Sequence, residues 1–422
     1  MTAQRILVDS QSLPSFIGKE SEQDFDQRAG LCQGDKGDIV ITTKPYEPAY
    51  LEYWQGLGYK IPHLVTAGPY DPHMALSDLI RTKEGVQSEI KSYLRENPRL
   101  EFFHGSARES RLAETLGSQM GIPSYMNFAF AEEFQRKDRF KNLFQVAGIE
   151  SLPFLECFEL KVPNWKSIEN TLGKTSLGYI AKNVYGSGGK SLGMIVPLRN
   201  KDDYINLPLG NYIIEPCIEV SHEIAVHWEI TFEGTIKKIG YFGQIASDLS
   251  YIGTHFPITI DQAIKRKLDR GFKKLTEEIR RRGGLGYMCC DVLVDKNSNI
   301  FWSDLNPRKG AIVFIHEAVA RLKNIRSMRN VHVAHQHISG TNLRSFKETS
   351  QVLGSFIEPS RDFILITNPG AIRYGFLDIT AISENSKECA MKLLRETKEV
   401  IHETLLASSR GREQGEVEVL KA

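Results

Sequence analysis

The chain has 422 residues, of which 41% are hydrophobic and 25% are charged, a composition typical of a globular protein with more than one structural unit. Its formal net charge is +1, so no overall field draws it to nucleic acid or to acidic membranes, and we expect neither as a partner. The six cysteines show no CxxC spacing, and no apolar run approaches the ~20 residues that span a bilayer, so we expect reduced thiols in a cytoplasmic protein.

Short apolar runs alternate with helical patterns over residues 1–122. The expected strands are 5–8, 39–43 and 100–103, and the expected helices are 47–56, 72–80, 84–95 and 107–119. This alternation predicts a parallel sheet covered by helices. The polar residues 18–38 predict a loop. No GxGxxG element follows the first strand, which argues against a dinucleotide site.

The pattern changes after residue 123. Residues 132–147 predict one helix, with Phe140 and Phe144 on its apolar stripe and Gly148 as its C-terminal stop. Lys137 lies on this helix, where the ordinary role of a lysine is an exposed, solvated charge. By itself the sequence favours that role.

Residues 178–196, GYIAKNVYGSGGKSLGMIV, predict two strands, 179–182 and 192–196, around a glycine-rich connection. That connection consists of Gly186, Ser187, Gly188 and Gly189. Glycines let backbone N–H groups approach phosphate oxygens, and Lys182 would add charge. The segment is not a P-loop, because Val184 stands where GxxxxGK[ST] requires glycine. A phosphate-binding flap and an ordinary hairpin with a glycine-rich turn both remain open.

A further apolar run, 212–215, ends in Glu215 and leads to a strand over 224–230. The end of such a strand can present backbone groups to an adenine edge, and Glu223 can accept hydrogen bonds from ribose hydroxyls. By itself, this pattern is only a weak indication of a nucleotide site. Beyond it, the sequence predicts a hairpin over 230–245, a polar loop over 246–260 and a long amphipathic helix over 264–279.

Residues 287–310, YMCCDVLVDKNSNIFWSDLNPRKG, predict a hairpin of two strands, 288–294 and 300–305. Such a hairpin folds Asp291 back beside Asp304, with Asn306 and Arg308 just beyond. Two carboxylates and an amide oxygen on one face suit Mg²⁺ and phosphate. The alternative is a surface hairpin whose acids face water.

The C-terminal part begins with an expected helix over 311–322. His332, His335 and His337 follow in an alternating stretch, but no cysteine or clear carboxylate partner shares their spacing, so a metal site there has little support. Segments 363–367, 373–382 and 387–402 predict a small α+β unit, and we expect the last dozen residues to be disordered.

The order of these features resembles the ATP-grasp superfamily of carboxylate–amine and related ligases. The order is a lysine-bearing helix before a glycine, a lysine-bearing strand, a glycine-rich flap, a strand ending in glutamate, and an acidic hairpin closing in N-P-R. Each motif alone is unspecific, but together in this order they are specific. The resemblance covers residues 123–320, and the ending DLNPRKG and the total layout are most similar to peptide ligases of the pheganomycin type.

The resemblance implies a fold of mixed α/β and α+β class with a two-lobed ATP-grasp core. The implied units are an α/β domain that precedes the ATP-grasp fold (1–122), a small lobe with the flap (123–210), a large lobe with the metal hairpin (211–325), a C-terminal α+β unit (326–408) and a disordered tail (409–422).

The resemblance also implies roles for individual residues. ATP would be held by Lys137, Lys182, Gly186, Ser187, Gly188, Gly189, Glu215, Cys217, Ile218 and Glu223. Within this set, Glu215 would take the adenine amino group, with the backbone of Cys217 and Ile218 beside it, and Glu223 would hold the ribose. Magnesium ions would be coordinated by Asp291, Asp304 and Asn306, and Arg308 would steady an acyl phosphate.

Two departures from the family pattern matter. The second acidic ligand is usually glutamate, whereas this chain has Asp304, one methylene shorter, which puts the number or geometry of the metals in doubt. Cys289 and Cys290 occupy the place where many of these ligases have an arginine, before the first metal-binding acid. Another cation, Arg308 or Lys309, would then have to stabilise the tetrahedral oxyanion.

The expected function is an ATP- and Mg²⁺-dependent ligase that activates a small-molecule carboxylate as an acyl phosphate and joins it to an amine, with amino acids or peptides as candidate substrates. Phosphoryl transfer depends on positioning and charge neutralisation, which fits a candidate set without a nucleophile–histidine pair. A kinase or carboxylase using the same nucleotide site, and a nucleotide-binding regulatory protein without turnover, are the alternatives. Dimers are common among such ligases, so a homodimer is a candidate assembly.

Overall fold

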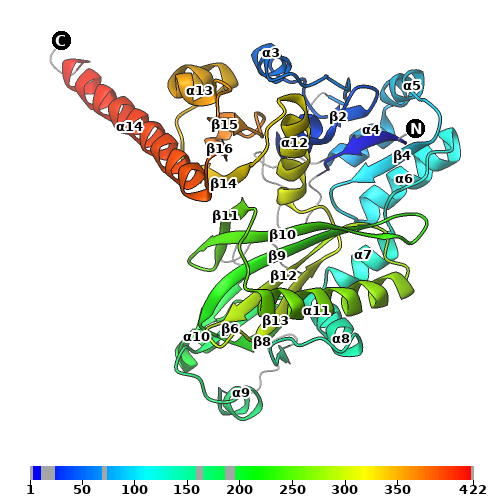
Figure 1. Ribbon diagram of the computed structural model, residues 1–422, viewed down its shortest axis with the longest axis vertical. Helices are drawn as coiled ribbons and strands as arrows, with labels where there is room; N and C mark the ends of the chain where they lie inside the picture. The colour runs from blue at the N-terminus through cyan, green and yellow to red at the C-terminus, as the bar shows by residue number, and fades with distance from the viewer. Residues whose placement is uncertain (1–2, 11–23, 69–73, 158–164, 186–194, 420–422) are drawn as a thin grey trace.

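The computed structural model describes residues 3–10, 24–68, 74–157, 165–185 and 195–419 (Figure 1). The described strands form three sheets, two of four strands and one of eight. The large sheet lies between the N-terminal domain and the small sheet that contains β6 and β8 (Figure 1). Among the described helices, none is both long enough and apolar enough to cross a bilayer.

The N-terminal domain is built on a parallel sheet, as the sequence predicts. Its strand order is β3 (His63–Thr66), β2 (Ile39–Thr42), β1 (Gln4–Val8) and β4 (Pro98–Phe102). Its helices are α2 (Gln27–Gln33), α3 (Pro48–Gly56), α4 (Leu76–Thr82), α5 (Glu84–Ser92) and α6 (Ala107–Met120). The prediction of a loop over 18–38 is wrong for α2, because its Leu31 and Cys32 are buried against α12.

The single helix expected over 132–147 is two helices, α7 (Phe128–Phe134) and α8 (Lys137–Val146). The break has a local cause. Arg136 has extended backbone angles, and the amide of Lys137 donates to the carbonyl of Val184, 3.0 Å away, instead of to a carbonyl of α7. This bond ties the start of α8 to the chain that follows β6.

The small sheet has the order β5 (Leu155–Cys157), β8 (Tyr212–Pro216), β6 (Tyr179–Asn183) and β7 (Ile195–Leu198), with helices α9 (Trp165–Leu172) and α10 (Lys201–Ile205). The division expected at residue 210 is therefore wrong, because β8 pairs with β6 and β5. The glycine-rich segment Gly186, Ser187, Gly188 and Gly189 lies outside the described residues.

The large sheet has the order β13 (Ile300–Asn306), β12 (Gly286–Asp295), β9 (Val220–Ile230), β10 (Ile236–Ser247), β11 (Ser250–Phe256), β14 (His332–Ser339), β16 (Phe376–Ser383) and β15 (Asp362–Ile366). Its helices are α11 (Gln262–Arg281), α12 (Ala311–Ile325), α13 (Phe346–Leu353) and α14 (Lys387–Val419). The expected C-terminal unit is thus a continuation of this sheet, the expected loop 246–260 contains β11, and α14 extends as far as Val419 into the expected disordered tail.

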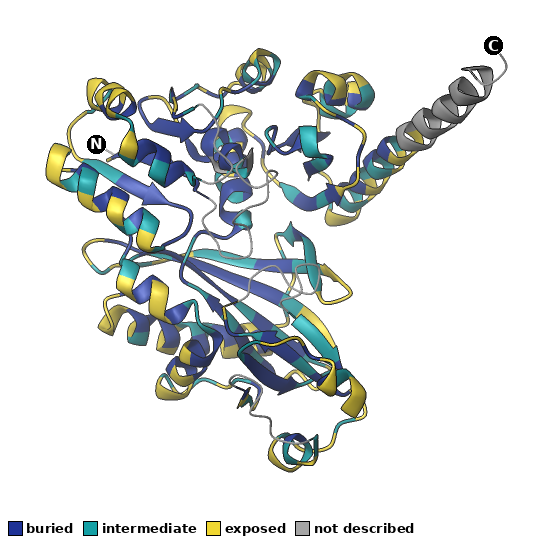
Figure 2. Ribbon diagram, turned by 180° about the vertical axis from the view of Figure 1, so that it is seen from behind, coloured by how far each residue is buried: buried dark blue, intermediate teal, exposed yellow. Residues whose placement is uncertain are grey.

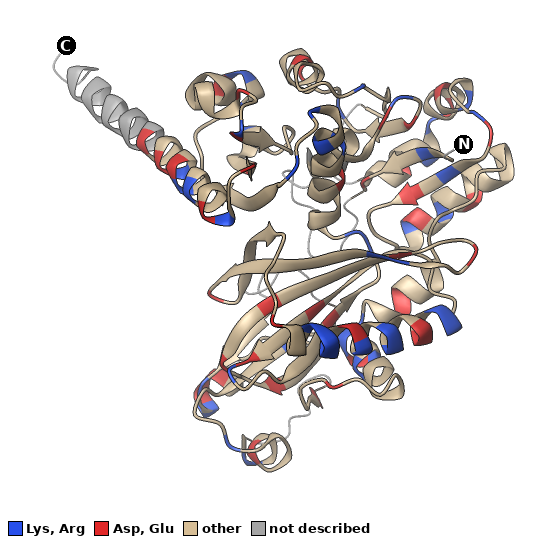
Figure 3. Cartoon of the chain, viewed as in Figure 1, with Lys and Arg blue, Asp and Glu red and all other residues tan. Residues whose placement is uncertain are grey.

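Burial follows the periodicity of the sequence. Figure 2 shows the central strands of the large sheet as buried. α11 buries Ile264, Leu268, Leu275 and Ile279, while its outer face is densely charged (Figure 3). Such a helix is stabilised chiefly by packing its apolar stripe on the sheet.

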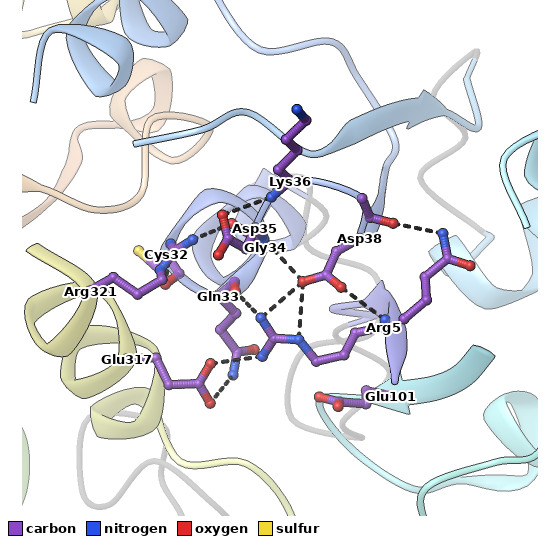
Figure 4. A network of polar contacts seen from close by, with 12 residues as sticks. Arg5, Cys32, Gln33, Gly34, Asp35, Lys36, Asp38, Glu101, Glu317 and Arg321 are labelled. Atoms are coloured by element: carbon purple, nitrogen blue, oxygen red, sulfur yellow. Dashed lines mark hydrogen bonds and ion pairs between the residues drawn. The ribbon is translucent and has the colours of Figure 1, made fainter. Parts of the chain in front are cut away.

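A polar network fixes the N-terminal domain to α12 (Figure 4). The Arg5 guanidinium on β1 donates to Asp38 at 3.0 Å and to Glu317 on α12 at 3.0 Å. Arg321 on α12 donates to the carbonyls of Leu31 and Cys32 at 2.6 and 2.8 Å. These carbonyls belong to the last turn of α2, so the network holds α2 against α12.

Candidate functional site

A cavity of about 400 Å³ opens where the small sheet, the large sheet and the N-terminal domain meet. Residues of β6 and β8 form one wall, and residues of β9, β10, β12 and β13 form the other. α2 and the start of α12 border the far end through Arg28 and Gly310.

Asp304 lies between the two lysines that the sequence assigns to ATP. Lys137 reaches its Oδ1 atom and Lys182 its Oδ2 atom, each at 3.3 Å. Burial opposes the ionisation of Asp304, but the neighbouring lysines outweigh it and hold its pKa well below its usual value. Lys137 is only 8% exposed, so the ordinary role of a solvated lysine does not apply.

Lys182 has polar partners in addition to Asp304. Its ammonium also donates to Ser303 Oγ at 2.9 Å and pairs with Glu215 Oε2 at 2.8 Å. Burial disfavours the charge of Lys182, yet Asp304 and Glu215 raise its pKa above the usual value. The lysine is therefore positively charged at neutral pH and lies in the cavity wall, where it can bind phosphate oxygens.

The structure corrects the role expected for Glu215. Its carboxylate is 1% exposed and pairs with Lys141, which is completely buried, as well as with Lys182. A carboxylate held between two ammonium groups is not a free acceptor for an adenine amino group. Its position instead makes it the counter-ion that orients Lys182, and the two lysines keep its pKa below the usual value in spite of burial.

Asp291 lies directly opposite Asp304 in the register of β12 and β13. It accepts a hydrogen bond from Gln244 Nε2 at 2.7 Å. Burial and the adjacent charge of Asp304 raise the pKa of Asp291 to about 6. Two neighbouring carboxylates of which one resists ionisation are a donor set that a divalent cation would neutralise.

Asn306 and Arg308 continue the same wall. Arg308 Nη2 donates to Asn306 Oδ1 at 3.0 Å, and its guanidinium lies 5.5 Å from the centre of the Phe103 ring. Asp291, Asp304, Asn306 and Arg308 all line the cavity, so the structure brings this predicted group together. Cys289 lines it too, but burial raises the pKa of its thiol to about 12, which makes it unsuited to act as a nucleophile.

Lys309 does not belong to the site, and its expected role in stabilising an oxyanion is corrected. Its side chain is 3% exposed and is turned towards the N-terminal domain. There the ammonium donates to Glu101 Oε2 at 2.7 Å and to Gln33 Oε1 at 3.0 Å. Lys309 therefore links the end of β13 to the N-terminal domain. Of the two expected cations, Arg308 is the one that lines the cavity.

The residues expected around the adenine and ribose also line the cavity. Glu223 is half-buried on β9, and burial raises its pKa. Cys217 and Ile218 follow β8, but the amide of Cys217 donates to the carbonyl of Gly178 at 3.0 Å. That N–H group is therefore committed to the small sheet and is not available to a purine.

Sequence reasoning missed four residues: Arg28, Lys141, Gln244 and Ser303. Lys141 had a readable signal, because it lies within the buried stripe of α8, where a lysine needs an acidic partner. Gln244 and Ser303 approach the site only through strand pairing. Arg28 lies in the segment expected to be a loop and approaches it only through the docking of α2.

No protein-family model matches the chain, and no curated protein matches it. An N5-carboxyaminoimidazole ribonucleotide synthetase in complex with ADP is 14% identical, with a TM-score of 0.58 over 89% of this chain and 94% of that one. The Aspergillus clavatus N5-carboxyaminoimidazole synthase with ADP and 5-aminoimidazole ribonucleotide is 13% identical, with a TM-score of 0.60 over 95% and 99%. A Campylobacter jejuni biotin carboxylase, solved as a βγ-ATP complex, is 13% identical, with a TM-score of 0.53 over 93% and 90%.

At this low identity the likeness shows the fold. The mixed α/β class and the ATP-grasp architecture expected from the sequence are confirmed. The narrower similarity to pheganomycin-type ligases remains a prediction.

Proposed function

We propose that this protein is an ATP- and Mg²⁺-dependent ligase that activates a carboxylate as an acyl phosphate and joins it to an amine. The observation that carries the proposal is the convergence of Lys137 and Lys182 on Asp304, beside Asp291 and Arg308, in one cavity. Phosphoryl transfer requires positive groups around the transferring phosphate, together with ordered ligands for a divalent cation. The peptide-ligase type suggested by the DLNPRKG ending is part of this proposal.

The donor set fits magnesium. Asp291, Asp304 and Asn306 offer oxygen atoms only, and the first two face each other across a strand pair. In this structure Asp304 is neutralised by lysines, so phosphate oxygens and a cation would exchange partners with it when a nucleotide binds. Magnesium would supply charge neutralisation between these side chains and the phosphates.

The other side chains of the cavity have separate roles in binding the phosphates and the acyl phosphate. Lys137 and Lys182 bind and orient phosphate oxygens, while Glu215 keeps Lys182 in place. Arg308 offers its guanidinium to the anionic acyl phosphate, and Asn306 Oδ1, like Asp304, would exchange its present partner for the cation. Because the cavity is lined by apolar residues such as Leu293 and Ile312 as well, it can limit the access of water to a hydrolysable intermediate.

Hydroxylamine trapping tests the proposal without knowledge of the amine. The purified protein is incubated with ATP, Mg²⁺, hydroxylamine and a panel of amino acids, short peptides and small carboxylic acids, and the hydroxamate and ADP are measured. The proposal predicts equal amounts of hydroxamate and ADP with at least one acid. Asp304→Asn should abolish both, whereas Asp35→Asn, at an exposed position, should change neither. ADP release without any hydroxamate would contradict acyl phosphate formation.

Carboxylation is the second candidate, because one of the similar structures is named a biotin carboxylase and others are N5-carboxyaminoimidazole synthetases. Bicarbonate would then replace the organic acid. ADP release that depends on bicarbonate, with incorporation of labelled carbonate into a product, would favour this function over ligation. A phosphorylated product with no second substrate consumed would indicate a kinase.

A further inference from the structure

The far end of the cavity contains a histidine held by a buried aspartate. His337 on β14 lines the cavity and its side chain is 30% exposed. Directly across the strand pair, Asp378 on β16 is 4% exposed and bonds to His337 Nδ1. Burial opposes ionisation of Asp378, but His337 and its hydrogen bond hold the pKa of the carboxyl well below its usual value. Asp378 is thus a carboxylate that accepts the Nδ1 proton.

This contact determines the tautomer of the imidazole. An ionised aspartate bonded to Nδ1 keeps the proton on that nitrogen and leaves the lone pair on Nε2. Because His337 is the member of the pair that lines the cavity, Nε2 is the atom left for a bound substrate. The arrangement therefore provides a proton acceptor in the same cavity as Arg308 and Asp304.

The groups around His337 come from four elements. His335 lies beside it on β14, with ring centres 4.9 Å apart, and burial lowers the pKa of His335 to about 3, which keeps that ring neutral. Tyr251 on β11 lies 5.8 Å away, ring to ring, and burial raises its pKa, so it too is neutral. Asp378 from β16 is the anion of the group, and Arg28 from α2 supplies a positive field that acts on Asp378.

We propose that His337, positioned by Asp378, is the general base that deprotonates the attacking amine. The inference rests on the proposed function, because a ligase whose acceptor arrives as an ammonium ion must remove a proton before nitrogen can attack. The expected site residues have other roles: Lys137, Lys182 and Arg308 are cations, and Asp304 and Glu215 are paired with lysines. Asp291 would hold the metal, and Glu223 would hold the ribose.

The step balances as follows. His337 Nε2 takes one proton from the ammonium group of the acceptor, and the freed nitrogen lone pair forms the C–N bond with the acyl carbon. The C–O bond to phosphate breaks, and its electron pair leaves with the phosphate oxygen. A second proton passes from nitrogen to the departing phosphate, which leaves as hydrogen phosphate, and the imidazolium later returns its proton to solvent.

A metal ion is the competing use of these side chains, since single ligand atoms of His335, His337 and Asp378 lie within 4.8 Å of one another. The positive field of Arg28 weighs against it, because this field acts on both His335 and Asp378. A neutral base bonded to one carboxylate agrees better with this charge balance than an added cation does.

The test compares two acceptors in the His337→Gln variant. The acid is the one found by hydroxylamine trapping, and the acceptors are hydroxylamine, which is mostly unprotonated at neutral pH, and the ammonium-bearing probes ammonium chloride and L-alanine. We expect hydroxamate formation near the wild-type rate but a loss of roughly 100-fold or more in amide formation, as for removal of a general base. His402→Gln, at an exposed position on α14, is the matched control and should leave both rates unchanged.

The pH profile separates a base from a structural residue. With an ammonium acceptor, His337→Gln should show a rate that rises about tenfold per pH unit with the free-amine fraction, whereas the wild type should reach a plateau. Asp378→Asn should lower the amide rate in the same acceptor-dependent way. Equal losses with both acceptors would overturn the inference while leaving the ligase proposal intact, as would one equivalent of zinc in the purified wild type that His337→Gln loses. Absence of hydroxamate from the wild type would overturn both.

Discussion

Removal of the Glu215 carboxylate tests the buried charge cluster most directly. Glu215→Gln leaves the ammonium of Lys141 without its counter-ion, and both side chains are at most 1% exposed, so water cannot compensate. Breaking a buried pair by removing one partner costs about 3–5 kcal/mol. We therefore expect the free energy of unfolding to fall by about this amount, which is a large part of the stability of an ordinary domain.

The reverse change should cost less. Lys141→Met leaves Glu215 paired with Lys182 at 2.8 Å, so about 1–3 kcal/mol is expected for the lost charge-assisted bond. The double variant removes both the carboxylate and the stranded ammonium. It should therefore be more stable than Glu215→Gln alone, a non-additivity that residues in contact commonly show.

Equilibrium urea unfolding, followed by far-UV circular dichroism and tryptophan fluorescence, measures these differences. The pH supplies a second check. Burial already lowers the pKa of Lys141 below its usual 10.5, and without Glu215 the shift should grow. A lysine with a depressed folded-state pKa destabilises the fold while it is charged, so the deficit of Glu215→Gln should shrink as the pH rises towards 10.5. A double variant whose loss equals the sum of the single losses, or a deficit that does not change with pH, would refute the reasoning.

Three further predictions concern the metal site, the domain contact and the start of α12. Because the pKa of Asp291 is raised to about 6, protons should compete with Mg²⁺ for its carboxylate. The Mg²⁺-dependent affinity for ADP, measured by calorimetry, should therefore rise about tenfold per pH unit up to about pH 6 and then level off. Asp291→Asn should weaken this affinity and remove its pH dependence. Glu317→Gln replaces the carboxylate that pairs with Arg5 by a neutral amide and should cost about 1.5–3 kcal/mol. The loss should appear as faster hydrogen exchange in α2, and unchanged exchange would show that this ion pair does not stabilise the contact. Gly310→Ala would place a Cβ 2.5 Å from the ring of His227 and should lower the free energy of unfolding by about 1–3 kcal/mol. Gly56→Ala is the control, because its Cβ would meet no atom within 4 Å and should cause no such loss. Equal melting temperatures for the two variants would contradict this prediction.

Local sequence patterns predicted the structure correctly where the contacting segments are close together in the sequence. The alternation of apolar runs predicted the parallel N-terminal sheet, and the hairpin that pairs Asp291 with Asp304 was readable because its turn and both strands are adjacent in sequence. The wrong predictions involve distant partners. β8 was assigned to the wrong lobe because strand pairing with β6 leaves no mark on its own residues. Glu215 was assigned to adenine because its two lysines come from other elements.

The amino-acid sequence by itself determined which chemistry this protein carries: oxygen ligands on a hairpin, lysines before and within the small sheet, and an arginine after the metal side chains. Only the tertiary structure decided which of these groups face one another. In the folded protein, Lys309 pairs with Glu101 of the N-terminal domain and does not line the cavity. Arg28 lines the cavity because α2 packs against α12, and Asp378 lies opposite His337 in the pairing of β14 with β16. The reason is physical: periodicity records which face of an element is buried, whereas the electrostatic partner of a buried charge is set by long-range packing that no local pattern encodes.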